Sequence, residues 1–205
     1  MGYYHIMYNG NGYENTGAAY KLLKKEENKV IYDKLDNYIF YGRKVDDEML
    51  SRKIYFRESD KGIFTDFVWL YGMTSRLVVS KRFLKLLQDF SLPKHQVIPI
   101  YLDETDEIFA YIINVYETFD ITCVDLDKSK FLKRTDDSIS VHVPFFKENI
   151  IGDLDLFLYK IKPNETDYPR GPFISNRLRK ALKKEKITGY SLMYRDSWYY
   201  YDEFK

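Results

Sequence analysis

The sequence has 205 residues, which suggests one large domain or two small ones, and its 32 Lys and Arg residues nearly balance 31 Asp and Glu residues, for a net charge of +1. A near-neutral chain argues against a general polyanion binder, which usually carries a basic excess. The single cysteine, Cys123, excludes an internal disulfide and is typical of a reducing compartment. No apolar run approaches 18 residues and no secretory signal is evident, so we expect a cytoplasmic protein without a membrane-spanning segment.

The first third of the chain predicts short elements. Residues 3–8 have the pattern of a strand, and an Asn-Gly turn follows at 9–12. Further along, the sequence favours a polar helix at 17–29, strands at 30–41 and 52–57, and a short helix beginning at Asp46. The aromatic stretch 63–71 favours neither helix nor strand.

The middle of the chain predicts a strand, a helix and a set of further strands. Leu77–Val79 is a short apolar strand, and Ser80 after it is a good N-cap. The helix that follows has apolar residues at helical spacing and ends before Pro93. Strands are then expected at 96–102, 108–117 and 121–125, with an acidic turn at 103–107.

The last third of the chain repeats this pattern of a strand, a serine N-cap and a helix. A strand at 154–162 is followed by Pro172–Ile174, by Ser175 as a second N-cap, and by a helix that is basic outside its apolar stripe. Residues 190–194 and 198–201 suggest a terminal hairpin. Segments 77–88 and 172–183 match at an offset of 95, either through an internal duplication or because strand–Ser–helix is a common local solution. We expect one α+β domain over residues 1–205, with a mixed, largely antiparallel sheet and a few packed helices.

No pattern of catalytic, metal-binding or cofactor-binding residues stands out. The three histidines are scattered without zinc spacing, and Cys123 lies in an apolar run, which predicts a buried, inert thiol. Gly10-Asn11-Gly12 lacks the third glycine of a dinucleotide loop, because Asn15 stands there. We therefore expect no enzyme, no metal and no cofactor.

Charge is unevenly distributed along the chain. Residues 96–127 contain no Lys or Arg and have a net charge of −8, whereas residues 170–186 have a net charge of +6. These runs are either two solvated faces or a patch that engages a partner of opposite charge. Acidic patches steer association and set specificity.

Several segments, in this order, resemble a bacterial family of immunity proteins from polymorphic toxin systems, first catalogued as a domain of unknown function. The segments are Arg76–Phe83, Tyr111–Val115, Cys123–Phe131, Leu156–Lys160, Phe173–Leu178 and Ile187–Tyr190. The resemblance covers about residues 64–195 and leaves residues 1–60 unmatched. It implies an α+β protein that binds and inactivates a secreted toxin encoded beside it, and it implies no enzymatic residues.

Three hypotheses follow from the sequence. The first is a toxin-neutralising immunity protein, whose partner is a cognate toxin domain rather than nucleic acid or a membrane. The second is an enzyme that uses carboxylates such as Asp120, Asp125 and Asp127, and the third is a nucleic-acid-binding module that uses the basic helix 175–186. For the first, the contact residues that we predict lie in the acidic turn: Asp103, Glu104, Asp106 and Glu107.

Overall fold

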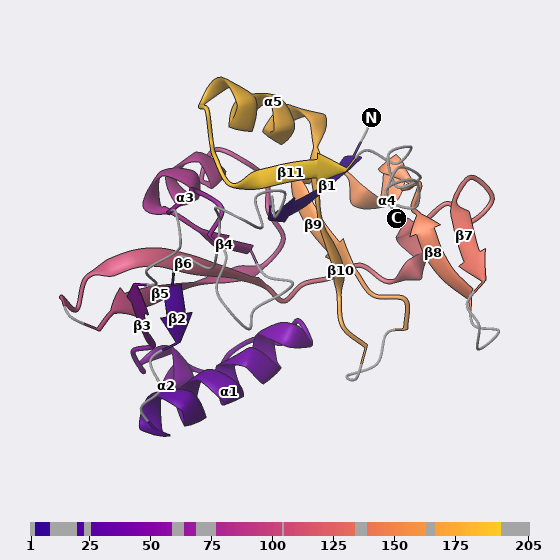
Figure 1. Cartoon of the computed structure of the whole chain (residues 1–205). Helices are drawn as coiled ribbons and strands as arrows, with labels where there is room; N and C mark the ends of the chain where they lie inside the picture. Colours follow the sequence, from indigo (N-terminus) through magenta and orange to yellow (C-terminus); the bar gives the residue numbers. More distant parts are fainter. Residues whose placement is uncertain are drawn as a thin grey trace.

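A computed structural model describes most of the chain (Figure 1). The described residues are 3–8, 20–22, 26–58, 64–68, 77–103, 105–133, 139–162 and 167–193.

The strands of the larger sheet lie between residues 20 and 115. Its strand order is β2-β3-β5-β6-β4, and only the pair β3–β5 is parallel. The strands are β2 (Tyr20–Leu22), β3 (Tyr55–Glu58), β4 (Leu77–Val79), β5 (His95–Leu102) and β6 (Ile108–Val115). This central sheet confirms the predicted strands at 77–79 and 96–102 almost residue for residue.

A second sheet joins the two ends of the described chain. Its order is β11-β1-β10-β9, with all neighbours antiparallel. The strands are β1 (Tyr3–Tyr8), β9 (Leu156–Tyr159), β10 (Arg170–Ser175) and β11 (Tyr190–Met193), and β7 (Lys130–Lys133) and β8 (Ile139–Val143) form a separate antiparallel pair. The predicted α+β class with largely antiparallel pairing is confirmed, although the strands fall into more than one sheet.

The described helices are short apart from the first. They are α1 (Glu26–Phe40), α2 (Asp47–Leu50), α3 (Lys81–Leu87), α4 (Glu148–Ile151), α5 (Asn176–Lys184) and the 3-10 helix η1 (Ile121–Cys123). The strand predicted at 30–41 is wrong, because this segment belongs to α1. Its Tyr32, Leu35 and Ile39 recur at helical spacing and are buried against the central sheet, and this packing outweighs the strand preference of its aromatic and β-branched residues. The polar helix predicted at 17–29 is wrong at 20–22, which form β2.

The strand predicted at 121–125 also needs correction. Residues 121–123 form η1 rather than a strand, because the Asp120 side chain accepts a hydrogen bond from the Thr122 amide at 2.8 Å and starts a turn. In the first strand of the predicted terminal hairpin, residues 190–193 form β11, which pairs with β1; residues 198–201 lie outside the described part of the chain, so the hairpin stays a prediction.

Helices cover both faces of the central sheet (Figure 1). On one face, α1 packs on Ile98, Ile100 and Ile112. On the other, α3 and α5 share one core with residues of both sheets, among them Val79, Ile113, Ile6, Leu156 and Ile174. This shared core joins the two sheets through the helix pair.

The two sheets contain matching units. Phe67 pairs antiparallel with Val79 before Ser80 and α3, and Leu156 pairs antiparallel with Ile174 before Ser175 and α5. The neighbouring strands also correspond, since the order β5-β6-β4 matches β11-β1-β10. A local strand–Ser–helix motif would not extend to these outer strands, so the structure favours the internal duplication. In the second copy, β1 takes the place that β6 holds in the first.

Candidate functional site

Two buried aspartates hold the helices α3 and α5 in matching ways. The Asp66 carboxylate accepts hydrogen bonds from Ser80 Oγ (2.7 Å) and from Arg82 Nη2 (2.6 Å). The Asp155 carboxylate accepts hydrogen bonds from Ser175 Oγ (2.6 Å) and from both Nε (3.0 Å) and Nη2 of Arg177. Each aspartate therefore fixes the start of the helix in its own unit.

Each aspartate also binds the segment that follows the other helix. Thr188, after α5, donates its amide to Asp66 at 3.1 Å, and Ser91, after α3, donates its amide to Asp155 at 3.0 Å. Arg82 donates to the Lys186 carbonyl at 2.7 Å. These crossed contacts make α3 and α5 antiparallel neighbours that are linked at both ends.

Ser80 and Ser175 are structural caps, as predicted. Each hydroxyl oxygen accepts a hydrogen bond at 3.1 Å from the backbone amide three residues later, which belongs to Phe83 or Leu178. The same hydroxyl donates a hydrogen bond to the aspartate of its unit. Burial by itself raises the pKa of Asp66 and Asp155, but the hydrogen bonds from the arginine, the serine and the backbone outweigh it, and the pKa of both carboxyls is lowered. Both groups are therefore ionised at neutral pH and act in holding the fold.

The acidic run at 96–127 does not form one patch. Its carboxylates flank β6, whose eight residues separate the two groups by roughly 24 Å. Several of them are paired with lysines: Asp106 with Lys53 (2.5 Å), Glu117 with Lys94 (2.9 Å) and Asp125 with Lys128 (2.8 Å). The net charge of the run therefore overstates the acidity of this surface.

The predicted contact residues in the acidic turn lie in different settings. Asp103 is half-buried, Asp106 and Glu107 are exposed, and Glu104 lies outside the described residues. The Asp106 carboxylate also accepts a hydrogen bond from Tyr55 at 2.9 Å, and its side chain is therefore held by this contact and by Lys53. The role of these four residues in binding a partner stays a prediction.

Two carboxylates of the alternative enzyme site, those of Asp120 and Asp125, make local contacts. Asp120 caps η1, Asp125 binds Lys128, and no group of three or more His, Cys, Asp or Glu side chains is placed to hold a metal ion among the residues that the structure describes. Cys123 is buried as predicted, and burial followed by the charge of Asp120 raises its pKa to about 12. The thiol is therefore protonated and unreactive at neutral pH.

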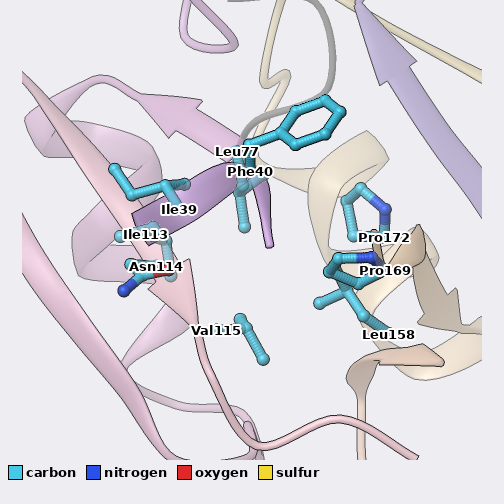
Figure 2. A pocket seen from close by; sticks show the side chains of 9 residues that line it. All are labelled: Ile39, Phe40, Leu77, Ile113, Asn114, Val115, Leu158, Pro169 and Pro172. Carbon is cyan, nitrogen blue, oxygen red and sulfur yellow. The ribbon is translucent and has the colours of Figure 1, made fainter. Parts of the chain in front are cut away.

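A small interior cavity lies where the two sheets meet (Figure 2). Its volume is about 30 Å³, enough for about one water molecule and too small for a substrate. The figure shows side chains from α1, β4, β6 and the β9–β10 region around it: Ile39, Phe40, Leu77, Ile113, Asn114, Val115, Leu158, Pro169 and Pro172. The cavity is therefore a small gap in the packing at this junction.

The exposed surface of the helix pair is basic. Lysines on α3 and α5 are exposed, and in the described part of the structure none of them forms an ion pair: Lys81, Lys85, Lys180, Lys183 and Lys184. The basic run that the sequence shows at 170–186 thus lies beside a second basic segment on α3. The spacing of residues in the sequence could not predict that these two basic segments are neighbours, because contacts between distant residues, those of Asp66 and Asp155, bring α3 and α5 together.

An open groove of about 580 Å³ runs between α3 and β5. Leu84, Phe90 and Val97 are among its apolar lining residues, and Gln88, Ser91 and His95 add polar groups. Val97 is 41% exposed although it lies within a strand. The groove depends on how α3 packs against the sheet, so no single segment of the sequence predicts it.

The described strands and helices define an α+β protein. A family model described as "Immunity protein family (Imm11)" matches residues 26–194. The chain belongs to this immunity protein family. The match begins at residue 26 with α1, so the region that the resemblance left unmatched is shorter than residues 1–60. No curated protein matches the chain. Among the described residues, no helix is both long and apolar enough to cross a membrane.

Proposed function

We propose that this chain neutralises the toxin domain of a polymorphic toxin system by binding it in the cytoplasm, without catalysing a reaction. The observation that carries this proposal is the family match over residues 26–194. The structure supports it, because the serines and aspartates that could suggest catalysis, Ser80, Ser175, Asp66 and Asp155, are engaged in holding helices.

The proposal is tested with the C-terminal toxin domain encoded by the neighbouring gene. Cells that express this domain should grow only when the chain is co-expressed, and the two purified proteins should elute together as a complex. Growth arrest that the chain does not relieve, together with separate elution of the two proteins, would contradict the proposal.

A mass measurement separates binding from catalysis. A binder acts only in stoichiometric amounts, so one-tenth of an equivalent of this chain should leave the intact mass of the toxin domain unchanged after prolonged incubation. A binding titration should saturate at a fixed ratio of the two proteins. A changed toxin mass at one-tenth of an equivalent would favour the enzyme hypothesis, with Asp120, Asp125 and Asp127 as the first residues to replace.

A further inference from the structure

We propose that the groove between α3 and β5 is the surface that binds the toxin domain, and that it receives an acidic segment of that domain with an apolar side chain at its centre. This inference rests on the proposed function, because it names the surface through which neutralisation would occur.

The groove has an uncovered apolar floor. Side chains alternate along β5, so Ile98 is buried towards α1 while Val97 points to the opposite face, where α3 covers the sheet only in part. Val97 therefore remains 41% exposed beside Leu84 and Phe90. Burial of such a side chain by a partner removes apolar surface from water and therefore favours binding.

The apolar surface continues beyond the groove along the same face of the sheet. Tyr101 follows Val97 by four residues in β5, pairs with Ile108 of β6, and lies with its ring 5.9 Å from that of Tyr55. Ile108 is also well exposed. A strip that combines a hollow with tyrosines and exposed aliphatic side chains has the composition of the centre of a protein interface. Its length favours a polypeptide over a small molecule.

Two lysines of α3 lie beside the groove. Lys81, Leu84, Lys85 and Gln88 recur at positions i, i+3, i+4 and i+7 of α3, so the two lysines share the helix face that lines the groove. Arg177 stacks on the ring of Phe90 at 5.1 Å, at the end where α5 begins. Carboxylates on the partner would form charge-assisted hydrogen bonds with Lys81 and Lys85 and would accelerate association.

The acidic turn is the competing surface. It lies beyond Tyr101 and Ile108, at the end of the strip away from the groove, and Lys53 and Tyr55 already bind its Asp106. The groove combines concave shape, exposed apolar area and two lysines, Lys81 and Lys85, that form no ion pair among the described residues. The two surfaces predict opposite charges on the toxin and can be separated experimentally.

The first experiment measures binding kinetics with the catalytically disabled toxin domain of the neighbouring gene. Val97→Glu places a carboxylate in the groove, and Val30→Glu makes the same change at a similarly exposed valine on α1. We expect the Val97 variant to bind at least about 100-fold more weakly and the Val30 variant to bind within about two-fold of wild type. If the melting temperature of the Val97 variant falls, the glutamate variants are replaced by variants that carry a benzophenone photocrosslinker at position 97 or at position 30. Crosslinking to the toxin is then expected at position 97 alone.

The second experiment tests the charge of the partner. The double variant Lys81→Glu/Lys85→Glu should associate about ten-fold more slowly at low salt, and its rate should depend less on salt. The control Lys29→Glu/Lys34→Glu changes the net charge by the same amount on α1 and should associate at a rate close to that of wild type.

The outcomes distinguish this inference from the proposed function. If wild type does not bind the toxin domain, the proposed function itself fails. The groove assignment alone is overturned if wild type binds but the Val97 variant or crosslinker gives the same result as the Val30 control. It is also overturned if Asp103→Asn/Glu107→Gln weakens binding while the groove variants do not. Tight binding of wild type to a 30-nucleotide RNA or DNA at physiological salt, lost on reversal of Lys81 and Lys85, would instead assign the basic surface to nucleic acid.

Discussion

Replacing Asp155 with alanine should destabilise the protein by about 3 kcal/mol. The carboxylate is 2% exposed and receives the Ser175 hydroxyl, the Ser91 amide and the Arg177 guanidinium. Loss of a buried acceptor costs about 1–3 kcal/mol for each donor that is left buried. Arg177 adds less, because its side chain is 63% exposed and can be solvated by water. Since Asp155 joins the start of α5 to the end of α3, the cost falls on both helices.

Urea denaturation at pH 7 measures this loss, with Asp153→Ala as the control because Asp153 is exposed two residues away. The control should change stability by less than about 0.5 kcal/mol, whereas Asp155→Ala should lower the melting temperature by roughly 6–12 °C. The lowered pKa of Asp155 means that its contribution is present above the unfolded pKa of about 3.9 and is lost as the pH falls below it. The difference between wild type and variant should therefore shrink below pH 4. A loss under about 1 kcal/mol at pH 7 would refute the assigned role.

The other predictions concern the caps and two buried groups. Ser80→Ala and Ser175→Ala should each cost about 0.5–2 kcal/mol in urea denaturation and leave toxin binding intact; an unchanged melting temperature with lost protection would contradict the cap assignment. Burial lowers the pKa of His5 to about 4 in the folded protein, so the stability it contributes above the unfolded pKa of about 6.5 should fall by at most about 3 kcal/mol as the pH drops towards 4. His5→Asn should flatten that pH dependence of the urea midpoint, and an equally steep dependence in the variant would assign it to other groups. Cys123 should react with a thiol reagent only in denaturant, and rapid reaction of the native protein would show that the thiol is accessible.

Local patterns predicted well wherever one short segment determines the structure. Leu77–Val79, Ser80 and Ser175 were predicted from neighbouring residues alone, because an N-cap depends on a hydroxyl and an amide three residues apart. The prediction for residues 30–41 was wrong because the composition of this segment favours a strand while the spacing of its apolar residues suits a helix. Burial of Tyr32 and Ile39 on the central sheet stabilises the helix.

The surface was harder to predict than the fold. Summing charges along 96–127 suggested an acidic patch, but Lys53 and Lys94 lie outside that stretch and neutralise Asp106 and Glu117 across strands. The groove was missed because it forms where α3 leaves part of the β5 face uncovered, and no single segment encodes that gap. The offset-95 repeat did contain a signal for the paired helices, but the aspartates that link them were not part of the matched residues.

The position of β1 determines when, during translation, the second sheet can fold. β1 lies between β10 and β11, and its partner residues are synthesised about 170 residues after it. At 5–20 residues per second, a ribosome takes roughly 10–35 s to cover that length. The second sheet can therefore close only after nearly all of the described chain has been translated, whereas β5 and β6 can pair much earlier. A newly made molecule would expose an incomplete sheet during this interval, so the onset of protection should lag behind synthesis, and the lag should lengthen with slower translation.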